Sequence, residues 1–187
     1  MGFARTYRKD AHYYLQLTGQ PPVQVFPESP TKFFATVVAA QISFMTGPNG
    51  RATGMVLHQN GYLRTWPRSS KTAYAAFESE LRHRIQENRP SPGTEAAIRR
   101  QIHSLESTGH GLYAEMTPEL AAAARAQDPQ TAALWKRLGA LRSLRFAGVL
   151  SNGSDDYNAT FAHGQLVIII SPLTSDGKIA GLLYRPD

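Results

Sequence analysis

The chain has 187 residues, no cysteine, 42% hydrophobic residues and only 18% charged residues. The hydrophobic fraction is enough for a packed core, and the absence of cysteine excludes disulfides, thiol nucleophiles and cysteine-ligated zinc. The longest aliphatic run, Leu166 to Ile170, is far shorter than the roughly 20 residues of a membrane-spanning helix, so we expect no membrane span.

The net charge of +6 and a pI of about 9.8 raise the hypothesis of nucleic-acid binding. The excess lies wholly in residues 1–92, which hold eleven Lys and Arg against five Asp and Glu, whereas residues 93–187 hold nine of each. Glutamates are interspersed among the basic residues of the N-terminal half. We therefore interpret these residues as a charged surface exposed to solvent, and we expect no nucleic-acid partner.

Residues 1–68 are predicted to form a β-rich module, a partial antiparallel sheet or open barrel. Apolar and aromatic runs alternate with turn residues, and Asn60-Gly61 is the dipeptide that most favours a type I′ hairpin. The predicted strands cover residues 13–17, 23–26, 32–38, 41–45, 53–58 and 62–64. We expect residues 1–12 to be frayed and to leave one sheet edge open.

Residues 69–92 are predicted to form a linking helix followed by a Pro- and Gly-rich seam. Ser69 or Ser70 can cap a helix that runs to about Asn88. The spacing of its apolar residues predicts one buried face, made by Tyr74, Phe77, Leu81 and Ile85.

Residues 93–187 are predicted to form an α+β unit, in which three helices pack on a curved four-stranded antiparallel sheet. Capping residues predict helices that start at Thr94, Thr117 and Asp128. The predicted strands cover residues 142–150, 156–161, 166–170 and 179–184.

The strand at 166–170 is apolar at every position, although a sheet covered by helices on one side normally alternates. Its second face must therefore pack against something else. We expect a homodimer or an interdomain interface through the sheet in the region of Leu166, Ile168 and Ile170.

Four consecutive strings in the N-terminal part carry a family resemblance: residues 17–22 (LTGQPP), 25–34 (VFPESPTKFF), 40–44 (AQISF) and 56–61 (VLHQNG). Over residues 13–64 the chain resembles the C-terminal domain of unknown function of beta-lactamase-like serine hydrolases, the penicillin-binding, class C-like group. The resemblance covers a quarter to a third of the chain. It implies a serine hydrolase domain as partner, with the present chain a piece of a longer, bacterial protein. The parent family is often exported, whereas the absence of a signal sequence here favours the cytoplasm.

Residues 94–187 resemble the cone-shaped domains similar to nuclear transport factor 2. This second resemblance rests on the order of the elements and on the segments Met116 to Leu120 and Asp176 to Gly181. It implies a pocket between helices and sheet, frequent dimerisation through the sheet, and either simple binding or isomerase-type chemistry.

The candidate pocket residues are five aromatic side chains predicted to lie on the inner side of this unit. They are Tyr113, Trp135, Phe146, Tyr157 and Phe161. The competing interpretation is an aromatic core, because these positions are apolar and isomerase chemistry needs an acid or a Tyr–Asp pair inside the pocket.

No catalytic residues are expected. Ser29-Pro30-Thr31-Lys32 matches the S-x-x-K motif of penicillin-binding proteins, but a proline follows the serine where a helix would have to run, so we interpret it as a turn. Asp155 and Asp156 are neighbours on a strand, and their side chains therefore point to opposite faces. The six histidines lack the spacing of metal ligands, so no metal or cofactor is expected.

These observations favour a non-catalytic accessory, regulatory or assembly module of a beta-lactamase-like serine hydrolase. The alternative is a pocket domain of the nuclear transport factor 2 type, with small-molecule binding or isomerase-like chemistry.

Overall fold

The computed structural model describes residues 2–59 and 61–186, which divide into two compact units. The first unit is Gly2–Glu80 and the second begins at Leu81. Their boundary lies inside helix α1 (Lys71–Glu87), within the segment predicted to be the linker. Each unit has its own hydrophobic core.

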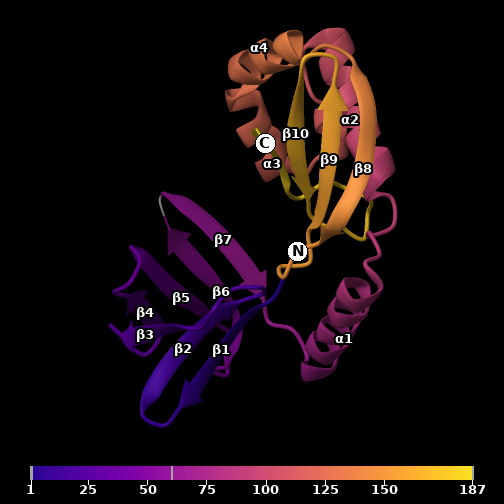
Figure 1. Ribbon diagram of the computed structural model, residues 1–187. Coiled ribbons are helices and arrows are strands. Elements are labelled where there is room, and N and C mark those ends of the chain that lie inside the picture. Colours follow the sequence, from indigo (N-terminus) through magenta and orange to yellow (C-terminus); the bar gives the residue numbers. More distant parts are fainter. Residues whose placement is uncertain (1, 60, 187) are drawn as a thin grey trace. The chain divides into compact units, whose positions relative to one another are not determined.

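The first unit is a meander of seven antiparallel strands that pair in chain order and curl into a half-barrel (Figure 1). The strands are β1 (Ala4–Lys9), β2 (His12–Leu17), β3 (Val23–Pro27), β4 (Lys32–Ala35), β5 (Ala40–Thr46), β6 (Ala52–Gln59) and β7 (Tyr62–Pro67). The predicted open antiparallel sheet is therefore confirmed. Its core is made by alternate side chains of the strands, which lie on one face of the sheet: Leu15, Val25, Ala40, Ile42, Met55, Leu57 and Trp66.

The prediction that residues 1–12 are frayed is wrong, because Ala4–Lys9 forms strand β1. It pairs with β2 over its whole length, from Ala4 opposite Leu17 to Lys9 opposite His12. The rings of Tyr7 and Tyr14 stack across this pair with centroids 5.4 Å apart. The strand is rich in charged residues, so its alternation of apolar and polar residues is weak. The pairing with β2 therefore determines its conformation.

Helix α1 starts where predicted, because the Ser70 hydroxyl oxygen accepts a hydrogen bond from the Ala73 N–H at 3.0 Å. The predicted buried face is only partly correct. Phe3 packs on Phe77 at 4.9 Å and on Tyr74 at 5.5 Å. Ile85, in contrast, is 44% exposed, and Arg84 is buried in its place.

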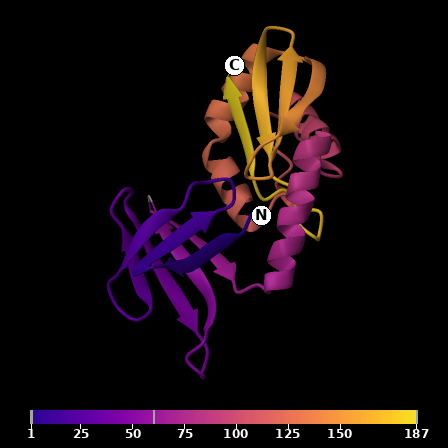
Figure 2. The ribbon, with the colours of Figure 1, turned by 60° about the horizontal axis from the view of Figure 1, so that its bottom comes forward.

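The second unit is α+β, as predicted, with a four-stranded antiparallel sheet in the order β11-β10-β9-β8 (Figure 2). The strands are β8 (Leu141–Val149), β9 (Asp155–Phe161), β10 (Gly164–Ile170) and β11 (Leu182–Pro186). The helices are α2 (Thr94–Thr108), α3 (Pro118–Ala126) and α4 (Asp128–Leu138), with a 3-10 turn η1 (Tyr113–Glu115) before α3. Thr117 caps α3 by accepting a bond from the Leu120 N–H, and a proline follows it, as the sequence predicted.

The core of the second unit contains the residues that were predicted to mark an interface through the sheet. Leu166, Ile168 and Ile170 are 2%, 0% and 0% exposed and belong to the same cluster as Ile98 and Ile102 of α2. These three side chains are covered by helices of their own unit, so they are not free to contact a second chain. Alternation along β10 places Val167 and Ile169 on the opposite face.

Within the part of the chain that the structure describes, no helix has the length and apolar character needed to cross a membrane.

Candidate functional site

Four of the five aromatic residues predicted to border a pocket form two ring pairs in the second unit. Trp135 of α4 packs edge-to-face on Phe161 of β9, with ring centroids 5.9 Å apart. Phe146 of β8 packs on Tyr157 of β9 at 5.4 Å. Trp135, Tyr157 and Phe161 are buried members of one hydrophobic core cluster. Their position favours the aromatic-core interpretation.

Tyr113, the fifth of these residues, lies in η1 and interacts with charged side chains. Its hydroxyl donates to Asp128 at the start of α4, and the Arg125 guanidinium lies 4.4 Å from its ring centroid. His110 Nδ1 is 3.3 Å from the Asp128 Oδ2 atom that accepts this bond. Burial and the bond to Asp128 raise the pKa of Tyr113 to about 12, because both disfavour the phenolate. Tyr113 is therefore a neutral hydrogen-bond donor at neutral pH.

A cleft of about 260 Å³ adjoins Asp128 in the second unit. Residues of α2, α3, α4 and β11 line it, and its walls are mostly aliphatic, with polar groups from Asp128, Gln127 and Gln130. The five predicted aromatic residues are not among the described residues that line it. Tyr184 of β11, which the sequence analysis did not select, lines the cleft and packs on Trp135 at 4.6 Å.

A buried polar cluster around Asp155 is the feature that sequence reasoning missed. Asp155 is fully buried, and its Oδ1 lies 2.5 Å from Arg84 Nη2. Its Oδ2 accepts a hydrogen bond from the Ser91 N–H at 2.8 Å and lies 2.8 Å from the Thr94 hydroxyl. The Tyr157 hydroxyl is 3.0 Å from that of Thr94. Both carboxylate oxygens are thus occupied, which makes the cluster structural.

The cluster joins the end of α1, the seam, the start of α2 and the start of β9. Arg84 also donates to the carbonyl oxygen of Gly153 at 3.1 Å. One sequence feature pointed to it: Arg84 lies three residues after Leu81, which places it on the predicted apolar side of the helix. Its partner is 71 positions away, so no local pattern identified Asp155.

Ser29 lies in the turn between β3 and β4, as predicted, and Lys32 is the first residue of β4. The Ser29 Oγ accepts hydrogen bonds from the backbone N–H of Thr31 at 3.3 Å and of Lys32 at 3.1 Å. The backbone N–H of Glu28 donates to the Lys32 carbonyl oxygen at 2.9 Å and closes the turn. The serine therefore stabilises the turn and is not placed on a helix as S-x-x-K chemistry requires.

No protein-family model, curated protein or solved structure matches this chain. The two family resemblances of the sequence therefore remain hypotheses. The α+β class and the strand orders stand on the structure itself.

Proposed function

We propose that the chain is a non-catalytic accessory module of a beta-lactamase-like serine hydrolase. The main support for the non-catalytic part of this proposal is the position of Ser29, whose hydroxyl oxygen accepts backbone hydrogen bonds within a turn. The strings that carry the resemblance fall on the consecutive strands β2 to β6 and on their turns. They therefore belong to one continuous sheet, which supports a resemblance between folded modules.

A hydrolysis assay tests the non-catalytic part of this proposal. The purified chain is incubated with a chromogenic cephalosporin and with p-nitrophenyl acetate, next to the Ser29→Ala variant. We expect the same rate as buffer from both proteins. Hydrolysis above buffer that is lost in Ser29→Ala would overturn the proposal.

The accessory role is tested by the effect of the chain on the kinetic constants of a serine hydrolase. The chain is added to a purified serine hydrolase domain encoded in frame with this sequence or beside it, and KM and kcat are measured. A saturable change in either constant supports the accessory role. Unchanged constants, together with no co-elution of the two proteins, contradict it.

The cleft beside Asp128 favours a second candidate function, the binding of a small molecule by a pocket domain of the nuclear transport factor 2 type. A volume of about 260 Å³ suits a compact ligand of few heavy atoms with one hydrogen-bond donor for the Asp128 carboxylate. Amide chemical shifts measured with a set of small polar fragments test this. Shifts confined to α2, α3, α4 and β11 support it, and no saturable shift at those elements excludes it.

Self-association is the third element of the proposal, and it is assigned to the outer face of the four-stranded sheet. Leu183 of β11 is 54% exposed and pairs with Ile169 of β10, which lies on that face. We expect light scattering to give a dimer for the chain and a monomer for Leu183→Glu, because the charge would be buried in the interface. Leu63→Glu, in the first unit and 70% exposed, is the matched control and should remain dimeric. A monomer for the unsubstituted chain contradicts the assignment.

A further inference from the structure

In the part of the first unit that the structure describes, the half-barrel is left open between its two edge strands. Strand β1 pairs with β2 and β7 pairs with β6, and in the described residues these two edges are not paired with each other. A side-chain hydrogen bond spans the gap, from Trp66 Nε1 to the carbonyl oxygen of Gly2 at 3.1 Å. A cavity of about 720 Å³ lies at this opening, within the range of volumes typical of small-molecule sites.

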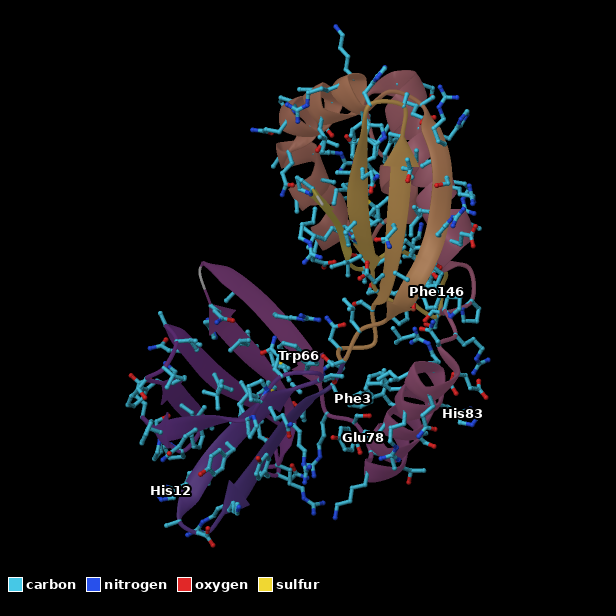
Figure 3. All side chains as sticks on the ribbon, in the orientation of Figure 1. Phe3, His12, Trp66, Glu78, His83 and Phe146 are labelled. Atoms are coloured by element: carbon cyan, nitrogen blue, oxygen red, sulfur yellow. The ribbon has the colours of Figure 1, made fainter. Side chains whose placement is uncertain are left out.

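The inner wall of this cavity is apolar and aromatic. Met55 and Trp66 are 5% and 8% exposed and belong to the core, while Phe3 and Phe44 are partly buried. Figure 3 shows Phe3 and Trp66 beside each other, with Glu78 of α1 nearby. Such a wall favours an apolar body, because each Å² of apolar surface removed from water contributes about 25 cal/mol.

The rim of the cavity is cationic. Among the described residues that line it are the cations Arg5, Arg68 and Lys71 and one carboxylate, that of Glu78. That carboxylate accepts a hydrogen bond from the Tyr74 hydroxyl. The rim therefore has an excess of positive charge, which favours an anionic group.

The rim cations are held in place by neighbours. The Arg68 guanidinium donates from Nη1 to the Ala52 carbonyl oxygen at 3.1 Å. Arg5 lies over the ring of Tyr7, 4.9 Å from its centroid. A guanidinium has five N–H donors in a planar fork, so one such contact orients it and leaves donors for a carboxylate. Lys71, in the first turn of α1, adds a cation beside the positive end of the helix dipole.

We propose that this cavity binds an amphipathic anion, an apolar body that ends in a carboxylate. The apolar body packs on Phe3, Met55 and Trp66, and the carboxylate lies against Arg5, Arg68 and Lys71. The site belongs to the first unit alone and does not depend on the accessory role proposed above.

Trp66 reports on the site directly. In the Trp135→Phe variant it is the only tryptophan of the chain, so its emission monitors the cavity. The probes are decanoate, decan-1-ol and decyltrimethylammonium, which share an alkyl chain of equal length and differ in the charge of the head group. All are used below their micelle concentrations.

We expect decanoate to change the Trp66 emission saturably, with one site per chain. Decan-1-ol should bind at least tenfold more weakly, and decyltrimethylammonium should give no saturable change. Arg68→Gln and Lys71→Gln should each weaken decanoate about fivefold to tenfold. Both should leave the affinity for decan-1-ol unchanged. Arg51→Gln removes an exposed cation outside the cavity and should leave decanoate binding unchanged.

Any of three results would overturn the proposal. One is the absence of a saturable change with decanoate in a chain whose circular dichroism shows it folded. Another is equal affinity for the three probes, which would show a merely apolar cavity. Weakening by Arg51→Gln as large as by Arg68→Gln would likewise assign the effect to net charge and contradict the site.

Discussion

At the scale of single residues, the most consequential contact is the buried pair of Arg84 and Asp155. A buried ion pair contributes little net stability, but removal of one partner leaves the other charge buried without compensation. We expect Asp155→Asn to lower the free energy of unfolding by about 3–5 kcal/mol, measured by urea denaturation.

Asp156→Asn is the matched control for that prediction. Asp156 is adjacent in sequence, and its Oδ1 is buried without a hydrogen-bond partner. Asp156→Asn removes this charge and should therefore leave the free energy of unfolding unchanged or raise it. Equal destabilisation by the two substitutions would show that the Arg84 contact does not account for the effect.

Tyr113 gives a prediction of pH dependence. Its pKa in the folded chain is raised to about 12 by burial and by the bond to Asp128. A raised pKa of a phenol means that the folded state holds the proton more tightly than the unfolded state. The contribution of Tyr113 to the stability of the folded state is therefore complete below about pH 10, the approximate pKa of tyrosine in the unfolded chain. This contribution is lost as the pH rises towards 12.

Absorbance titration of the phenolate measures this group. The difference between the unsubstituted chain and Tyr113→Phe should be one ionisation centred near pH 12. Asp128→Asn should move this ionisation to lower pH, because the neutral amide no longer disfavours the phenolate. A difference curve centred near pH 10 would contradict the assigned contacts.

At the scale of elements, the packing of β6 against its neighbours depends on Gly54. A Cβ at this position would lie 2.7 Å from the Trp66 carbonyl oxygen and 2.5 Å from the end of the Met45 side chain. The carbonyl belongs to the backbone of β7 and cannot move without disturbing the strand pair. Gly54→Ala should therefore destabilise the first unit by about 1–3 kcal/mol in urea denaturation.

Gly47→Ala is the control for this prediction. Its nearest contact to a new Cβ is the Thr53 methyl group at 3.3 Å, which a small rotation relieves. We expect Gly47→Ala to lower the free energy of unfolding much less than Gly54→Ala does. A larger effect of Gly47→Ala would contradict the close approach of β6 and β7.

At the scale of the whole molecule, the chain has two cores that share no residue and one tryptophan in each. Trp66 lies in the core of the first unit and Trp135 in that of the second. The variants Trp135→Phe and Trp66→Phe therefore report the unfolding of each unit separately. We expect two urea transitions with different midpoints, because each core is buried independently.

The same pair of reporters separates local from global effects. Asp155→Asn should lower the midpoint reported by Trp135 and leave that reported by Trp66 unchanged. Coincident midpoints that shift together would show a single cooperative unit and contradict the division.

The sequence alone determined the strand and helix types over most of the chain. Turn residues and period-two alternation predicted β2 to β7, and Thr117-Pro118 predicted the start of α3, because these preferences act within a few residues. It also identified Ser29–Lys32 as a turn, since a proline beside the serine disfavours the required helix. Local chemistry is enough for such features.

Only the tertiary structure decided which side chains meet. Strand β1 needed β2 as a partner, Arg84 became buried because Asp155 lies opposite it, and Leu166 is covered by helices of its own unit. The cavity at the opening of the half-barrel depends on residues from both ends of the first unit, Phe3 and Trp66 among them. Contacts between distant residues are set by how the elements pack, and a pattern of a few residues carries no information about that packing.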